Sequence, residues 1–211
     1  MDTFETAFRY TILNEISGDK ISDDNAFDSG GFTYYGIARN IWPSWRGWPL
    51  VDADIKHFGR PKSFSENPEL AELAKDFYYV NFWRGNGLDR IAVYSPSIAI
   101  EVFDTAVNGV GAVLLQKTLN LMNRRGTLWP DIKVDGVVGL VTVGTFITAF
   151  KKRGERRIYR ILNAYQGKRY IDLMEGNPDK YEEFLGWFER LSFDLPVLAP
   201  DKGLRNIADS A

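Results

Sequence analysis

The chain has 211 residues, of which 45% are hydrophobic and 14% aromatic, enough apolar material for a sizeable core and too much for a disordered protein. Its length fits one large domain, or a domain with a small subdomain. Lys and Arg number 26 against 28 Asp and Glu, so no overall field points to a nucleic-acid partner, and the basic run at 151–157 is interpreted as a solvated helix start or loop.

Several kinds of site are excluded by residue counts. The chain has no Cys, which rules out disulfides and cysteine nucleophiles, and its single histidine, His57, makes a metal centre or a Ser–His–Asp triad a poor expectation. The first ten residues lack the pattern of a signal peptide. No apolar stretch approaches the ~18 residues that would span a bilayer, so we expect no stable membrane insertion.

The first segment of the chain, residues 3–15, has the periodicity of an amphipathic helix. Its apolar stripe begins with Phe4 and Phe8, and Glu15 falls on the same stripe where the helix ends. Residues 16–37 are rich in Gly, Asp, Ser and Asn, which predicts an irregular loop or a short hairpin.

Most of the remaining chain is predicted to be helical. Asn67-Pro68 and Pro96 mark helix starts, and Gly109 and Gly111 mark the point where the long helix from Pro96 can divide. In chain order we predict a loop with a single helical turn at 42–49, a helix from 65–68 to 82–83, a helix from 96 to 122, helices from 140, over 155–174 and over 178–190, and then an extended tail.

Carboxylates are the groups left to carry chemistry. A glycosidase needs a protonated acid beside the leaving oxygen and usually a second carboxylate that directs water or forms a covalent intermediate. Glu15 suits the first role, because apolar surroundings at a helix end would keep its carboxyl protonated. Asp28 precedes Ser29-Gly30-Gly31, where small residues let a sugar approach the backbone. On these residues alone, a salt bridge at a helix end is the commoner role of such a glutamate.

Aromatic residues cluster near these loops. Carbohydrate sites favour aromatic faces beside a few polar groups, although core packing is the commoner role of any single Trp. The clustered residues are Tyr34, Tyr35, Trp42, Trp45, Trp48 and Trp83.

An ordered set of short motifs extends over residues 4–190. The motifs are Glu15, then Asp28-Ser29-Gly30-Gly31-Phe32-Thr33-Tyr34-Tyr35-Gly36-Ile37, Phe82-Trp83, Val102-Phe103-Asp104-Thr105-Ala106-Val107-Asn108, Leu115-Gln116, Val134-Asp135-Gly136-Val137-Val138-Gly139 with Thr142, and Gly186-Trp187 with Arg190. In this order they resemble the motifs of glycoside hydrolase family 108, lysozyme-like N-acetylmuramidases often found as phage endolysins. The Val-Asp-Gly motif resembles the family's C-terminal part, called peptidoglycan-binding.

The resemblance implies a mainly α, lysozyme-like fold with a small irregular loop or β-hairpin lobe after the first helix. It implies a catalytic part over residues 1–110 and a helical peptidoglycan-binding-like part over 111–190, packed on it as one compact unit. Residues 191–211 would form an extended tail.

The resemblance also implies the site. Glu15 would be the general acid and Asp28 the second carboxylate. Asp24 and Asp23 stay open as competitors, because the interval between Glu15 and Asp28 is longer than in the family and the interval to Asp24 is similar to that of phage lysozymes. The substrate-binding residues implied are Thr33, Tyr34, Tyr35, Trp83, Asp104, Asn108 and Gln116. For Asp104 and Asn108, hydrogen bonding to the loop is the alternative role, and Asp135-Gly136 is predicted to be a turn.

The activity implied is hydrolysis of the β-1,4 bond between N-acetylmuramic acid and N-acetylglucosamine, without cofactor or metal. Two alternatives stay open: a lytic transglycosylase that uses the same glutamate, and a catalytically inactive cell-wall-binding or secretion-associated protein on a lysozyme-like fold. The expected partner is the peptidoglycan glycan strand, with a holin-like export partner. We expect synthesis in the cytoplasm and action on the cell wall or in the periplasm; the sequence carries no signal of oligomeric state.

Overall fold

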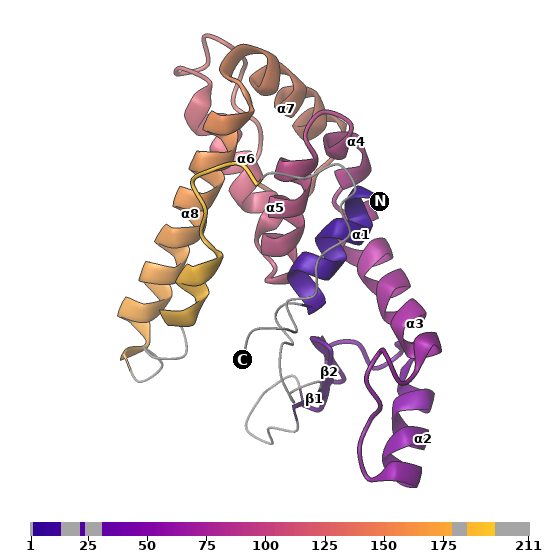
Figure 1. Cartoon of the computed structure of the whole chain (residues 1–211). Helices are drawn as coiled ribbons and strands as arrows, with labels where there is room; N and C mark the ends of the chain where they lie inside the picture. The colour runs from indigo at the N-terminus through magenta and orange to yellow at the C-terminus, as the bar shows by residue number, and fades with distance from the viewer. Residues whose placement is uncertain (1, 14–21, 24–30, 179–184, 197–211) are drawn as a thin grey trace. The chain divides into compact units, whose positions relative to one another are not determined.

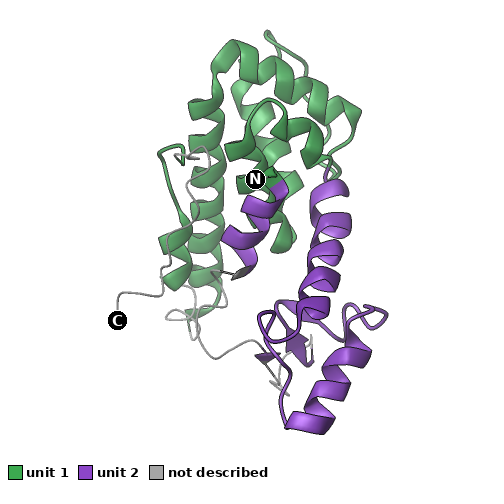
Figure 2. Ribbon diagram, turned by 45° about the vertical axis from the view of Figure 1, so that its right-hand side comes forward, with its two compact units in different colours: residues 1–3, 87–211 green, residues 4–86 purple. Residues whose placement is uncertain are grey.

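A computed structural model describes residues 2–13, 22–23, 31–178 and 185–196 of the chain. Two compact units make up the molecule (Figure 2): unit 1 contains residues 1–3 and 87–211, and unit 2 contains residues 4–86. The fold is mainly helical with a small antiparallel sheet after the first helix, which confirms the predicted fold class.

Unit 2 begins with a helix and the sheet. Helix α1 (Thr3–Phe8) continues as a π-helical segment, Arg9–Leu13. The sheet has the order β1-β2-β3, with β1 pairing antiparallel to β2 and β2 to β3. The strands are β1 (Ser22–Asp23), β2 (Thr33–Tyr34) and β3 (Ile37–Ala38), labelled in part in Figure 1.

A helix follows where the sequence predicts only one helical turn. Helix α2 (Trp48–Phe58) starts inside the Trp- and Pro-rich stretch, with Pro49 in its first turn. Proline is well tolerated there, because its fixed backbone angle suits the first turn and its missing N–H has no helical partner to lose. The expectation of a loop at 42–49 is therefore wrong from Trp48 onward, and α2 ends at Gly59 in the left-handed conformation.

Helix α3 (Pro68–Tyr78) starts as predicted and passes into a π-helical segment, Tyr79–Arg84. The Asn67 side chain accepts a hydrogen bond from the Leu70 N–H at 3.3 Å and so caps the helix. Aromatic rings from α1, the sheet, the 42–46 loop, α2, α3 and the following π-helical segment form the core of unit 2. They include Phe4, Phe8, Tyr34, Trp45, Trp48, Phe77, Tyr78 and Trp83, all buried.

Unit 1 consists of packed helices. Ser95 caps the predicted helix at Pro96: its Oγ accepts from the Ile98 N–H at 3.0 Å and donates to Glu155 Oε1 at 2.5 Å. Helix α5 packs against α4, α6 and α8, and α6 packs against α7 and α8. The helices are α4 (Leu88–Ala92), α5 (Pro96–Val107), α6 (Gly111–Met122), α7 (Leu140–Arg153) and α8 (Glu155–Gly176) (Figure 1).

The long predicted helix from Pro96 divides into α5 and α6 at its glycines. Gly109 adopts a positive φ of 78°, which favours glycine. Gly111 allows a close approach of α6 to α5, because a Cβ atom there would lie 2.3 Å from the Val102 carbonyl oxygen. Since α5 is buried on nearly all of its faces, this approach closes the core of unit 1.

The last predicted helix, over 178–190, is described only in part. Its last five residues, Gly186–Arg190, form a 3-10 helix, whereas residues 179–184 lie outside the described part, so the predicted helix stays a prediction there; residues 197–211 also lie outside the described part. The spatial division falls at 86/87, whereas the division predicted from the motifs falls at 110/111 and stays a prediction.

Across the described residues, no helix combines the length and apolar character needed to cross a membrane. The same residues contain no group of three or more His, Cys, Asp or Glu side chains placed to hold a metal ion.

We predict that Gly111→Ala destabilises the protein by about 1–3 kcal/mol, because the added methyl group meets the backbone of α5. Urea unfolding measures the change. Gly144→Ala in α7 is the matched control, since a Cβ atom there meets nothing within 4 Å, and it should stabilise the helix by about 0.5–1 kcal/mol. Equal effects of the two substitutions would contradict the close approach of α5 and α6.

Candidate active site

The predicted catalytic carboxylates fall almost entirely outside the described residues. This is true of Glu15, Asp24 and Asp28, and for Asp23 the structure gives only the backbone, which lies in β1 opposite Thr33. Their roles therefore stay predictions. What the structure describes is the hairpin that follows them in the sequence.

The hairpin turn is built around Tyr35. Its backbone is left-handed, with φ of 46°, and its ring stacks on Phe64 with 3.5 Å between centroids. The Tyr78 hydroxyl donates to the Tyr35 carbonyl oxygen at 2.8 Å, and the Phe64 N–H donates to the Tyr35 hydroxyl at 3.3 Å. Gly36 is required beside this contact, because a Cβ atom would lie 2.7 Å from the Tyr78 hydroxyl. The turn is thus fixed by side chains distant in sequence.

The two residues before Tyr35 are also held by internal contacts. Tyr34 is fully buried, and its hydroxyl donates to the Lys62 carbonyl oxygen at 2.7 Å. The Thr33 hydroxyl donates to the Gly31 carbonyl oxygen at 3.2 Å. These residues shape the hairpin, and burial leaves Tyr34 no free surface for a ligand in this arrangement.

Trp83 lies in the core of unit 2. It is 1% exposed, and its ring lies 5.6 Å from the ring of Phe4. The structure therefore places this predicted groove residue among core aromatics, and a substrate contact by Trp83 stays a prediction.

Asp104 and Asn108 lie together at the end of α5 in unit 1. Asn108 Nδ2 donates to the Asp104 backbone oxygen at 3.3 Å. The Asp104 carboxylate is 5% exposed and accepts from Gln166 Nε2 of α8 at 3.4 Å, while the same Nε2 donates to the Tyr170 hydroxyl at 2.8 Å. Asp104 thus belongs to a polar network between α5 and α8, and exposed Asn108 binds the backbone of its own helix.

Glu101 is a buried carboxyl that the sequence analysis did not select. It lies one turn before Asp104 on α5 and is 9% exposed. Burial, and then the charge of Asp104, raise the pKa of Glu101 to about 8, against hydrogen bonds with Asn163 and Tyr159 that lower it. A carboxyl with this pKa is largely neutral at pH 7. The signal for it was the spacing of two acids on one face of an otherwise apolar helix.

Gln116 organises the loop before α7. The residue is 1% exposed, and its Nε2 donates to Asp135 Oδ1 at 2.9 Å and to the Val137 carbonyl oxygen at 3.0 Å. Its Oε1 accepts from the N–H groups of Asp135 and Gly136 at 3.1 and 3.0 Å. Hydrogen bonds to the Asp135 carboxylate lower its pKa below the usual value. The largest effect comes from the Gln116 side chain and the second from the Val137 N–H. Both polar atoms of Gln116 are therefore engaged within the protein, and a role in binding substrate stays a prediction.

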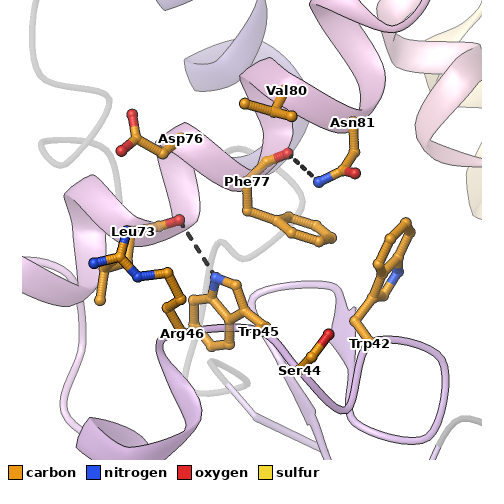
Figure 3. A pocket seen from close by; sticks show the side chains of 9 residues that line it. All are labelled: Trp42, Ser44, Trp45, Arg46, Leu73, Asp76, Phe77, Val80 and Asn81. Atoms are coloured by element: carbon orange, nitrogen blue, oxygen red, sulfur yellow. Dashed lines mark hydrogen bonds between the residues drawn. The ribbon is translucent and has the colours of Figure 1, made fainter.

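A pocket of about 510 Å³ lies in unit 2 between the 42–46 loop and the side of α3 (Figure 3). The Trp45 indole N–H donates to the Leu73 carbonyl oxygen at 3.3 Å and fastens the loop to the helix. Residue 47 must be glycine for the backbone to lie this close to the Trp45 ring, because a Cβ atom at this position would lie 2.3 Å from the ring atoms of Trp45. The other lining residues are Trp42, Ser44, Arg46, Asp76, Phe77, Val80 and Asn81.

Two family matches cover most of the chain. Residues 18–109 match glycosyl hydrolase 108, and residues 110–192 match the family described as predicted peptidoglycan domain. The first match contains the hairpin and the aromatic pocket and begins three positions after Glu15. A comparison with curated proteins finds no match.

We predict that the wild-type protein loses stability between pH 4.5 and 8, and that the Glu101→Gln variant does not show this loss. The folded-state pKa of Glu101 is raised from 4.5 to about 8, so the stability that the neutral acid contributes is complete below pH 4.5 and is lost as pH rises toward 8. Each unit of pKa difference corresponds to about 1.4 kcal/mol. Melting temperatures across this pH range measure the difference.

The exposed Glu72 on α3 provides the control for this prediction. Glu72→Gln keeps Glu101 and should therefore show the same fall in stability between pH 4.5 and 8 as wild type. Parallel curves for wild type and Glu101→Gln would show that Glu101 does not titrate in the predicted window.

Proposed function

Since residues 18–109 belong to glycosyl hydrolase family 108 and residues 110–192 are a predicted peptidoglycan domain, we propose that the chain hydrolyses the β-1,4 bond between N-acetylmuramic acid and N-acetylglucosamine. The pairing of these two matches in one chain carries the proposal. The family supplies the reaction type, glycoside hydrolysis, and the second domain supplies the polymer, peptidoglycan.

In the proposed reaction Glu15 is the general acid. Its proton passes to the glycosidic oxygen as the bond from that oxygen to the anomeric carbon breaks. A water oxygen then bonds to the anomeric carbon and gives its proton to a carboxylate. Asp28 is the proposed second carboxylate, which positions or activates this water or stabilises the oxocarbenium-like transition state, and Asp24 and Asp23 are its competitors.

The contacts that anchor the described hairpin are consistent with this assignment. The Thr33–Ile37 motif is anchored by Tyr78 and Phe64, so it gives the acidic segment before it in the sequence a fixed end. Catalytic groups need support of this kind, because small displacements of a general acid cost large factors in rate.

Action on the cell wall completes the proposal. The glycan strand of peptidoglycan is the partner, and the resemblance to phage endolysins supports a holin-like partner for passage out of the cytoplasm. No cofactor is part of the proposed reaction.

We predict that Glu15→Gln lowers the rate of peptidoglycan hydrolysis by about 10²–10⁴-fold, the usual contribution of general acid catalysis. Release of soluble fragments from purified peptidoglycan by wild type and variant measures it, with the exposed Glu72→Gln as control. Equal release by wild type and Glu15→Gln would remove Glu15 from the mechanism, and no release by either would favour a binding protein.

The second carboxylate is tested by separate Asn substitutions at Asp23, Asp24 and Asp28. The proposal expects the largest loss of hydrolysis from Asp28→Asn. A larger loss at Asp24 or Asp23 would transfer the role to that residue.

A further inference from the structure

We propose that the pocket between the 42–46 loop and α3 is a second carbohydrate site, which binds an N-acetylated amino sugar of the glycan strand (Figure 3). The choice of peptidoglycan as the source of this sugar rests on the proposed function; the sugar chemistry rests on the pocket itself. Its volume of about 510 Å³ falls within the range of roughly 300–1,000 Å³ that is usual for small-molecule sites.

The pocket has an aromatic wall. Trp42 is half-buried, and its ring meets Phe77 edge-to-face with 4.9 Å between centroids and an interplanar angle of 85°. Phe82 makes a second contact of this kind at 6.2 Å. These contacts fix the plane of the indole and leave part of it open to the pocket. The apolar C–H face of a pyranose ring, or the methyl group of an acetamide, fits such a surface.

Polar groups of both kinds surround this wall. Asn81 Nδ2 donates to the Phe77 carbonyl oxygen at 2.8 Å, which orients the amide and leaves its Oδ1 as an acceptor at the rim. Asp76 adds an exposed carboxylate, Arg46 an exposed guanidinium and Ser44 a hydroxyl. Within the described residues, none of the ion pairs involves Asp76 or Arg46. Sugar hydroxyls and an acetamide offer the matching donors and acceptors.

This combination favours a sugar over other ligand classes. The opposite charges of Asp76 and Arg46 leave the pocket without the net positive charge that a phosphate-rich ligand needs, and a purely apolar ligand would cover both groups without satisfying them. A second pocket, in unit 1, is mainly apolar and has no aromatic and polar mixture of this kind: its lining is Ile171, Met174, Pro178, Leu185 and Phe188 with one carboxylate, Glu175. The mixture of aromatic faces and uncommitted polar groups is thus a property of the unit 2 pocket.

A second sugar site has a consequence for a polymeric substrate. A glycan strand bound at two places dissociates more slowly, because each contact keeps the other at a high effective concentration. Every lining residue belongs to unit 2, so the site is complete within that unit.

The test uses the full chain and tri-N-acetylchitotriose as the probe, with NMR signals of the tryptophan indole N–H groups as the readout. Trp42→Phe assigns the Trp42 signal among those of the six tryptophans. We expect this signal to shift on titration. The signal of Trp129 should stay in place, because this indole is buried in unit 1 and donates to the Leu119 carbonyl oxygen.

Two variants on the same helix make the comparison specific. Asp76→Ala removes an exposed lining carboxylate and should lower the affinity for the probe about tenfold, the effect of losing a hydrogen bond to a charged acceptor. Glu72→Ala removes an exposed carboxylate that does not line the pocket and should keep wild-type affinity. A stationary Trp42 signal, or equal affinities of the two variants, would overturn the proposal.

Digestion of purified peptidoglycan by the same preparations separates the two proposals. Digestion with a stationary Trp42 signal refutes the second sugar site alone. A shifted Trp42 signal without digestion supports the sugar site and refutes the hydrolase.

Discussion

Strands of two residues cannot hold a hairpin by backbone hydrogen bonds alone, so the hairpin of unit 2 depends on the contacts of Tyr35. Its ring stacks on Phe64 and its carbonyl oxygen is bound by the Tyr78 hydroxyl. A left-handed backbone at a tyrosine costs about 1–3 kcal/mol and persists only where its surroundings enforce it. The strain is therefore evidence that α3 and the loop before it determine the shape of the turn.

Buried polar groups play two different parts in unit 1. Gln116 satisfies both of its polar atoms and holds the 135–142 loop in one arrangement, which explains an amide in an apolar core. Glu101 and Asp104 bring two carboxyl groups together in the same core, and neutrality of Glu101 is the inexpensive way to bury both. The two groups link stability to pH in opposite directions: the contribution of the Gln116–Asp135 contact is lost as pH falls, whereas that of neutral Glu101 is lost as pH rises.

The sequence predicted the helices whose ends carry local signals. Asn67-Pro68 and Pro96 mark starts because caps and first-turn prolines act within one turn, and Gly109 marks a break because its positive φ is a local requirement. Helix α2 was missed because Pro and Gly near Trp48 look like loop residues unless proline falls in the first helical turn. The motifs also predicted the family and the hairpin.

Which aromatic and polar side chains are buried could not be predicted from the sequence. Trp83 and Trp42 are the same residue type near candidate loops, yet one lies in the core and the other lines a pocket, because tertiary packing decides which ring is covered. Gln116 appeared as a motif residue, and only the fold reveals its hydrogen bonds to residues 135–142. The spacing of Glu101 from Asp104 was the one sequence signal for this residue, and its raised pKa also depends on α8, far away in sequence.

The central proposal is that this chain, whose residues 18–109 match glycosyl hydrolase 108, adds water to the anomeric carbon of N-acetylmuramic acid. Digestion of peptidoglycan in water labelled with heavy oxygen, followed by mass spectrometry of the fragments, tests it most directly. The account predicts the label at the new reducing end of muramic acid. Label on glucosamine ends, or unlabelled 1,6-anhydromuramic ends, would contradict it.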